Sequence, residues 1–391
     1  MALRKNYHVP LKVNDNIPIN FAINYNLTTR SKMTIYTIPL EKIAYKCTCY
    51  FNFLRRLNKE VFRKVGLSLV ILCLANTMAT SQQVKSKRMK NTVSTIETPL
   101  SLQAKFIANT MALLQMDKKL ERKILNNSLS KEAAKIPKSF YKSYAIQTVQ
   151  QDNRSVWEIE RRSTEPQLII LYLHGGAYCA NLTTPHWQLI EKLVLATNAK
   201  VIVPDYPLAP EANCLTTYQF IDTLYKRLSK LYPDKQIVFM GDSAGGGIAL
   251  GFAQTIKNEA IKQPSDIVLF SPWLDASMSH PDLLEVDKKD HMLSVNGLKY
   301  AGINYAGGLA LTDYRVSPIY GDFNGLARIT IFTGTNDILV VDARKCKKLL
   351  EEQGVDFNYF EYKDLFHDWV IITSLIESRD VINKVSAILR N

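Results

Sequence analysis

Cysteine is scarce in this 391-residue sequence, and the six cysteines form no repeated spacing. The close pair Cys47 and Cys49 lies too far from any histidine to suggest a zinc site. If an N-terminal leader is removed, three cysteines remain, which is an odd number. The sequence therefore predicts no disulfide framework and no structural metal. The six are Cys47, Cys49, Cys73, Cys179, Cys214 and Cys346.

Net charge is missing from most of the chain, although the whole sequence has a formal charge of +13. Residues 1–90 contain 16 Lys or Arg and 3 Asp or Glu, whereas the remainder has 33 of each sign and is neutral. The body of the protein has no electrostatic reason to bind phosphates, so we expect no nucleic-acid partner. The alternative is nucleic-acid binding through the basic arm, which predicts salt-sensitive binding that is lost when residues 1–90 are removed.

The sequence also lacks an apolar run of the roughly 20 residues that a confident transmembrane helix needs. The run in residues 65–79, VGLSLVILCLANTMA, is shorter, follows basic residues and ends at the small residue Ala79. These are the parts of a secretory signal, so the segment predicts a periplasmic or secreted protein, or membrane association. A signal is out of place behind a basic leader over residues 1–64, and one hypothesis is a translation start near Val61. The alternatives are an uncleaved anchor, or a cytoplasmic protein in which the segment is a buried helix.

Internal repeats and low-complexity tracts are absent, so the rest of the chain is divided by its composition. Residues 80–99 are polar and predict a linker. Residues 100–136 have apolar side chains at helical spacing, which predicts one or two helices. Residues 140–149 and 156–162 alternate in the manner of strands. We expect a single α/β domain over residues 100–391.

Short apolar, β-branched runs begin at residue 168 and alternate with segments of helical period. This alternation is typical of a mostly parallel sheet with helices on both faces. The interval 273–327, rich in Asp, Gly, Pro and Tyr, breaks the rhythm, and we expect it near the carboxyl ends of the strands, where open α/β sheets bind ligands. The expected strands lie in 168–174, 200–206, 236–241, 266–272, 328–334 and 357–362, and the helices in 186–197, 215–231, 244–258 and 340–353.

A lone serine stands between two glycines where the expected strand 236–241 meets the next helix. The stretch reads Gly241-Asp242-Ser243-Ala244-Gly245. A G-x-S-x-G between strand and helix places the serine on a strained turn with its hydroxyl exposed above the sheet, and the glycines remove side chains that would collide there. The pattern predicts Ser243 as a nucleophile, while the alternative is a tight turn with an inert serine.

A nucleophilic serine needs a base, and the base needs an acid that orients it. In this kind of fold both follow the serine along the chain. Among the histidines, only His367 follows a late strand with enough chain before it to contain an acid. Asp337 lies just after the strand 328–334, at its carboxyl end, and we expect it to be the acid. Asp342 is the rival, at the start of a helix, whereas Asp364 and Asp368 are expected to be surface groups.

Attack on a carbonyl also requires N–H donors for the oxyanion that forms. The stretch LHGGAY over residues 173–178 follows the first long apolar strand. Backbone N–H groups from this glycine loop, Gly175 included, and from Ala244 are expected to converge on one oxygen. The alternative is a plain glycine turn.

Six motifs in order and register resemble the hormone-sensitive-lipase-like branch of the α/β-hydrolases, which are carboxylesterases and lipases. The resemblance covers residues 100–391 and implies an α/β-hydrolase fold. It implies Ser243 as nucleophile, Asp337 as acid and His367 as base, and a substrate-covering cap built from residues 100–136 and part of 273–327. It also implies oxyanion donors from Gly176, Ala177 and Ala244. The motifs are HGGAY (174–178), DYPLAPE (205–211), GDSAGG (241–246), SPWLD (271–275), GTNDIL (334–339) and FHDW (366–369).

The first motif departs from the family pattern, which often has a third glycine where this chain has Ala177. An alanine keeps the backbone N–H donor provided that its φ is negative, and its methyl group narrows the neighbouring pocket. His174 is expected to support this loop rather than to transfer protons.

These residues together predict a serine carboxylic-ester hydrolase that acts on small to medium acyl esters and uses no cofactor and no metal. A lactone hydrolase or an amide hydrolase would use the same three residues. A different class is a degenerate hydrolase that serves as a receptor for a small ligand. Such proteins usually lose one member of the triad, whereas all three are present here.

Overall fold

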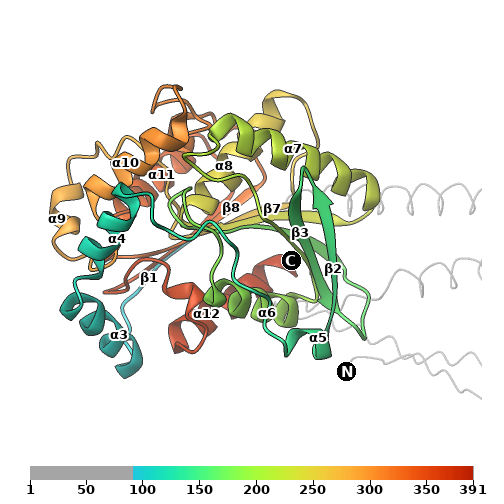
Figure 1. Ribbon diagram of the computed structural model, residues 1–391, viewed down its shortest axis with the longest axis horizontal. Helices are drawn as coiled ribbons and strands as arrows, with labels where there is room; N and C mark the ends of the chain where they lie inside the picture. Colours follow the sequence, from blue (N-terminus) through green and yellow to red (C-terminus); the bar gives the residue numbers. More distant parts are fainter. Residues whose placement is uncertain (1–90, 391) are drawn as a thin grey trace, which may run out of the picture. The chain divides into compact units, whose positions relative to one another are not determined.

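The computed structural model describes residues 91–390 (Figure 1). Within them nine strands form one sheet, in the order β1-β9-β8-β7-β6-β4-β5-β3-β2. All neighbouring pairs are parallel except β3 with β5 and β2 with β3. The predicted α/β class with a mostly parallel sheet is confirmed. The strands are β1 (Thr92–Ile96), β2 (Tyr144–Gln151), β3 (Arg154–Arg161), β4 (Leu168–Leu173), β5 (Lys200–Pro204), β6 (Gln236–Asp242), β7 (Asp266–Phe270), β8 (Arg328–Gly334) and β9 (Phe357–Tyr362).

The central strands are apolar throughout because both faces of the sheet are covered. Ile169 and Leu171 of β4 belong to the core on one face, whereas Ile170 and Tyr172 belong to the core on the other. This alternation follows from the two-residue period of a strand. The continuous apolar runs of the sequence therefore indicated strands with two buried faces.

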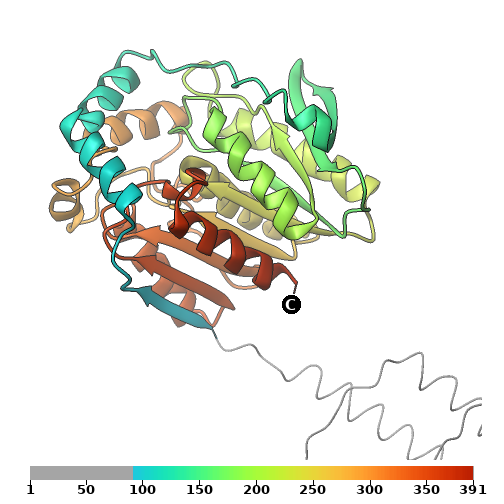
Figure 2. The same cartoon turned by 90° about the horizontal axis from the view of Figure 1, so that it is seen from below.

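Helices pack on both faces of the sheet. Figure 1 shows α7, α8 and α11 on one side, and Figure 2, turned by 90°, shows α6 and α12 in front of the other. The helices are α3 (Leu102–Leu113), α4 (Met116–Leu125), α5 (Phe140–Ser143), α6 (Thr184–Thr197), α7 (Cys214–Leu231), α8 (Ser243–Asn258), α9 (Leu283–Asp287), α10 (Val295–Ala306), α11 (Val340–Glu352) and α12 (Ile376–Leu389), with the 3-10 turns η1 (Pro318–Tyr320) and η2 (Trp369–Ile371).

The predicted linker over residues 80–99 is wrong for its last part. Residues Thr92–Ile96 form the edge strand β1, which pairs in parallel with β9. The segment TVSTI is mostly β-branched and so favours a strand, although it is short and largely exposed. The predicted leader 1–64 and the signal-like segment 65–79 lie outside the described residues. Among residues 91–390, no helix is long and apolar enough to cross a membrane.

The two segments expected to form a cap contact each other. The Asp117 backbone N–H of α4 donates to the His291 carbonyl at 3.1 Å, and the Asn296 amide of α10 donates to Glu121 at 2.6 Å. By contrast, α3 is anchored to the C-terminal helix, because the Ser101 N–H donates to Glu377 at 2.7 Å. That α4 and α10 cover the substrate stays a prediction.

Candidate active site

Three predicted site residues follow three strands of the parallel part of the sheet. Ser243 comes directly after β6, Asp337 follows β8 and His367 follows β9. The carboxyl ends of parallel strands meet at one edge of a sheet, and β6, β7, β8 and β9 are consecutive neighbours there. The topology therefore brings residues that are far apart in sequence to one place.

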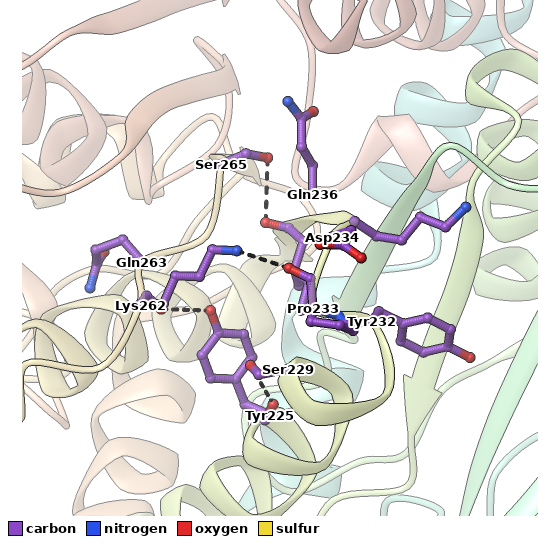
Figure 3. A pocket seen from close by; sticks show the side chains of 11 residues that line it. Tyr225, Ser229, Tyr232, Pro233, Asp234, Gln236, Lys262, Gln263 and Ser265 are labelled. Carbon is purple, nitrogen blue, oxygen red and sulfur yellow. Dashed lines mark hydrogen bonds between the residues drawn. The ribbon is translucent and has the colours of Figure 1, made fainter.

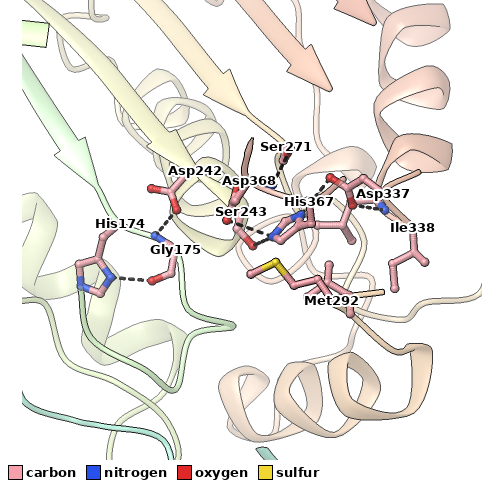
Figure 4. A network of polar contacts seen from close by, with 12 residues as sticks. His174, Gly175, Asp242, Ser243, Ser271, Met292, Asp337, Ile338, His367 and Asp368 are labelled. Carbon is pink, nitrogen blue, oxygen red and sulfur yellow. Dashed lines mark hydrogen bonds and ion pairs between the residues drawn. The ribbon is translucent and has the colours of Figure 1, made fainter. Parts of the chain in front are cut away.

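At this edge His367 lies between Ser243 and Asp337 (Figure 4). The distance from His367 Nε2 to Ser243 Oγ is 2.9 Å, and His367 Nδ1 lies 2.9 Å from Asp337 Oδ2. A carboxylate only accepts, so Nδ1–H donates to Asp337 and the Nε2 lone pair accepts the serine hydroxyl proton. All three side chains are buried, with 5% of Ser243 and 2% of His367 exposed.

The turn at Ser243 is tight, as the glycine pattern predicted. Ser243 has a φ of +49°, in the left-handed region. A Cβ at Gly241 would stand 2.6 Å from the carbonyl carbon of Gly245, and one at Gly245 would overlap the carbonyl oxygen of Leu173. Both glycines are therefore required by the close approach of the strands β4 and β6 to the start of α8.

The glycine loop after β4, residues 174–178, differs from the prediction in two ways. The Gly175 N–H donates to Asp242 Oδ2 at 2.9 Å. Because this group already has an acceptor, the prediction that Gly175 is an oxyanion donor is wrong. Ala177 has a φ of +52°, so the condition of a negative φ, on which its role as an oxyanion donor depended, is not met. The reason is a closed turn in which the N–H groups of Cys179 and Ala180 both donate to the Gly176 carbonyl, at 3.0 and 2.8 Å.

Gly176 and Ala244 remain the predicted donors, whereas Ala177 has a backbone N–H but not the φ that the prediction required. Ala244 is in the first turn of α8, where backbone N–H groups have no partner within the helix and favour an anion. Gly176 has a φ of +121°, and a Cβ there would stand 2.5 Å from the Ala180 carbonyl oxygen. Its glycine is therefore a conformational requirement of the loop.

His174 supports the glycine loop from beneath. Its ring stacks on Tyr206 with centroids 4.3 Å apart, and its Nδ1–H donates to the Gly175 carbonyl at 2.7 Å. Burial lowers the pKa of His174 to about 4, so the ring is neutral at physiological pH. These contacts fit the predicted supporting role.

The prediction that Asp364 and Asp368 are surface groups holds only for the first. Asp364 is exposed, but the Asp368 side chain is only 8% exposed and its Oδ2 lies 3.1 Å from His367 Nε2. Asp368 has a φ of +52°, which turns the chain so that two consecutive side chains face the same space. The rival acid Asp342 is buried in α11 and has no hydrogen-bond partner for either carboxyl oxygen among residues 91–390.

Sequence reasoning missed Asp290, which lies beside the acid. Its Oδ2 accepts the Ile338 N–H at 2.9 Å, and its Oδ1 accepts the N–H groups of Met292 and Leu293 at 2.8 and 2.9 Å. Burial, followed by the negative charge of Asp337, raises the pKa of Asp290 to about 7. The motif around the acid, GTNDIL, gave no signal for Asp290, because Asp290 lies in the irregular interval 273–327, 47 positions before Asp337.

A separate pocket of about 370 Å³ opens at the opposite edge of the sheet (Figure 3). It is lined by Gln236 and Ile237 at the start of β6, whereas Ser243 follows the end of that strand. Seven residues of strand separate the two places by about 20 Å. The Lys262 ammonium, at the wall of this pocket, donates to the Pro233 carbonyl at 3.4 Å.

Among residues 91–390, no group of three His, Cys, Asp or Glu side chains is arranged to hold a metal ion.

Comparison with known proteins gives matches over this same region. Residues 170–371 match a family described by the α/β-hydrolase fold. An esterase of Acinetobacter venetianus is 31% identical over 216 residues, which cover 54% of this chain and 70% of the relative. An acetyl-hydrolase of Streptomyces hygroscopicus is 27% identical over 223 residues, which cover 56% and 75%.

A solved structure of an esterase from the bacterial hormone-sensitive lipase family superposes with a TM-score of 0.63. The match covers 75% of this chain and 99% of the other, at 21% identity. At this identity the likeness concerns the fold, and it extends the agreement beyond the segment that the family match covers.

Proposed function

The chain belongs to the α/β-hydrolase family, and we propose that it is a serine carboxylic-ester hydrolase that works through an acyl-enzyme. The observation that carries the proposal is the position of His367, with Ser243 Oγ 2.9 Å from one ring nitrogen and Asp337 Oδ2 2.9 Å from the other. This is the geometry of a base that takes a hydroxyl proton and is oriented by an acid.

In the first half of the reaction Ser243 Oγ attacks the ester carbonyl carbon while His367 Nε2 takes the hydroxyl proton. The Asp337 carboxylate holds the Nδ1–H and stabilises the imidazolium. The tetrahedral intermediate then expels the alcohol, which receives its proton from Nε2. The products of this step are the free alcohol and an acyl group bonded to Ser243.

In the second half a water molecule attacks the acyl carbonyl and gives its proton to His367 Nε2. Collapse of the intermediate releases the carboxylic acid, and Ser243 Oγ regains the proton from Nε2. In both halves the N–H groups of Gly176 and Ala244 are the proposed donors to the oxyanion. Loss of one such donor typically costs about 10²–10³-fold in rate.

The substrate class we propose is small to medium acyl esters. One relative is named an esterase and another an acetyl-hydrolase, which supports short acyl groups. The site itself is nearly closed to solvent, since Ser243 and His367 are 5% and 2% exposed. A lactone or an amide would use the same three residues, so both stay alternative substrates.

The test is ester turnover by the full chain. A panel of p-nitrophenyl esters graded from acetyl to dodecanoyl, with lactones beside it, is expected to show turnover that is strongest for the short acyl groups. The Ser243→Ala variant should lose activity by on the order of 10⁴–10⁶-fold with an unchanged fold. The matched control is Ser139→Ala, at an exposed serine whose side chain makes no capping hydrogen bond. Equal turnover by Ser243→Ala and the wild type would contradict the proposal.

We also propose export or membrane association, supported by the sequence of residues 65–79 alone. N-terminal sequencing of the native protein is expected to find a first residue near Thr80. A first residue near Met1 would contradict cleavage of this segment.

A further inference from the structure

The ring of His367 has a carboxylate at each of its two nitrogens. Asp337 faces Nδ1, and Asp368 Oδ2 lies 3.1 Å from Nε2, the atom that also faces Ser243 Oγ at 2.9 Å (Figure 4). The mechanism proposed above uses Asp337 and leaves Asp368 without a role. Asp368 is nevertheless buried against the atom through which the proton passes.

The backbone holds Asp368 in this place. Its φ of +52° is in the left-handed region, which Asp and Asn tolerate better than other residues with a side chain. Its N–H donates to Ser271 Oγ at 3.3 Å, and the following residue, Trp369, is fully buried at the start of η2. The backbone of Asp368 is therefore held in place, and its carboxylate faces His367.

A carboxylate at Nε2 favours one protonation state of the ring. When the imidazole is neutral with its proton on Nδ1, Nε2 offers a lone pair, which repels an ionised Asp368. When the ring is an imidazolium, the Nε2–H can donate a hydrogen bond to Asp368 Oδ2 or to Ser243 Oγ. Asp368 therefore stabilises the charged ring, the state that forms when Ser243 gives up its proton.

Other charged groups lie around this pair, and their partners are different. Asp242 accepts from Gly175 N–H, Tyr172 hydroxyl and His186 Nε2. Asp290 accepts the backbone N–H groups of Ile338, Met292 and Leu293. Each of these two carboxylates has N–H or O–H donors of its own, whereas Asp368 Oδ1 has no partner among residues 91–390.

The charges around His367 also favour the imidazolium. Burial opposes the positive charge of His367, but Asp337 and Asp368 together raise the pKa of the ring well above its usual value. Burial raises the pKa of Asp368 to about 6, against the attraction of His367. The attraction between the two groups favours the state in which an imidazolium lies beside a carboxylate.

We propose that Asp368 is a positioning residue that holds the Nε2 proton of the His367 imidazolium and thereby sets the pH at which the base becomes free. The inference rests on the proposed ester hydrolase function. It predicts a base that is stronger than an ordinary imidazole and becomes available only at higher pH, because Nε2 must lose its proton before it can accept the one from Ser243.

The test is the pH profile of kcat/KM for Asp368→Asn and Asp368→Gly. Both variants suit a left-handed φ, and glycine also removes the Asn amide, which would donate to Nε2. The acid limb is expected to move to lower pH by about one unit or more, the usual size of a shift from one opposite charge at this distance. The alkaline plateau should fall because the base is weaker, so the variant and wild-type profiles cross. Asp368→Glu should move the limb part of the way back.

The matched control is Asp364→Asn, four residues earlier in the same loop, with a φ of +58° and an exposed side chain. It should leave the limb in place. Thermal unfolding of each variant shows whether it is folded. Folded Asp368 variants that lose activity equally at every pH, with an unmoved limb, would overturn the proposal.

A second readout does not need turnover. Titration of the His367 ring protons by NMR in the resting protein should give a lower imidazolium pKa in Asp368→Asn than in the wild type. If no ester is hydrolysed but this shift is found, the proposed function fails and the Asp368–His367 coupling stands. If esters are hydrolysed and neither the limb nor the NMR titration moves, the coupling fails alone.

Discussion

The backbone N–H of Gly175 donates to the carboxylate of Asp242 at 2.9 Å. Gly175 follows β4 and Asp242 ends β6, so this bond joins the glycine loop to the residue before the nucleophile. The same carboxylate accepts from Tyr172 and from His186 Nε2, the latter at 3.1 Å. Asp242 therefore fixes the glycine loop after β4 relative to Ser243.

Asp242→Asn should reduce both stability and turnover. The asparagine amide keeps one oxygen that can accept a hydrogen bond. Its NH₂ group replaces the other oxygen and faces a donor that was bonded to the carboxylate, so that donor loses its acceptor. One buried donor left unpaired costs about 1–3 kcal/mol in the free energy of unfolding. Urea unfolding and steady-state kinetics measure the two effects, and we expect kcat to fall more than KM rises, since this loop contains the proposed oxyanion donor Gly176. A variant with wild-type kcat would show that the loop keeps its place without this bond.

Asp337→Asn should lose activity while keeping the fold. Asp337 Oδ1 accepts the Leu339 N–H at 2.9 Å, so an Asn that keeps this bond turns its NH₂ toward His367 Nδ1. That arrangement favours the tautomer with its proton on Nε2, which cannot accept from Ser243. We expect kcat/KM near neutral pH to fall by about 10³–10⁴-fold. Thermal unfolding serves as the control, and a loss below tenfold would point to another acid.

Ala177→Gly and Gly176→Ala form a pair with opposite expected results. A left-handed φ costs an alanine about 1–2 kcal/mol, whereas glycine adds up to about 1 kcal/mol of chain entropy. Ala177→Gly should therefore raise the free energy of unfolding by up to about 1 kcal/mol and preserve turnover of short esters. Gly176→Ala should lower both, because its Cβ would meet the Ala180 carbonyl oxygen at 2.5 Å. Chemical unfolding and ester turnover test the pair, and a stabilising Gly176→Ala would contradict the loop geometry.

Asp342→Asn should change how stability depends on pH. Burial, with the nearby charge of Asp275 adding to it, raises the pKa of Asp342 to about 8. The folded protein therefore binds a proton that the unfolded chain releases near pH 4, and stability is lost as the pH rises from about 4 to 8. The free energy of unfolding of Asp342→Asn relative to the wild type should thus increase over that range. Urea titrations at pH 5 and pH 9, with Asp364→Asn as the control, measure it. A difference that stays constant with pH would place the Asp342 pKa near its usual value.

The sheet and the three contacting residues could be predicted because each depends on a local pattern. Apolar runs such as LIILYL fix a strand with two buried faces, and a parallel sheet brings the residues after its strands together. Ser243, Asp337 and His367 were found in this way, each just after a strand. β1 was missed since it is only five residues long, lies within a polar stretch and has three exposed and two partly buried residues.

The rest of the site depends on features that no local pattern carries. The direction of Asp368 follows from a left-handed φ at that residue, and the use of the Gly175 N–H follows from a side chain on another strand. The φ of Ala177 is set by a turn that closes three residues later. Asp290 reaches the acid across an irregular segment. Tertiary contacts decide all four, so the sequence indicated that Ser243, Asp337 and His367 meet, but not that Asp290 and Asp368 join them or how the donors are shared.

The bond from the Ile338 N–H to Asp290 has a mechanical consequence. Asp290 belongs to the loop that also accepts the Asp117 N–H of α4 through His291, so α4, this loop and the segment of the acid are linked in series. A movement that lifts the loop away from the sheet breaks the bond beside Asp337 and loosens the acid. The position of the backbone beside Asp337 is therefore coupled to the position of α4, although the two are more than 200 residues apart in sequence.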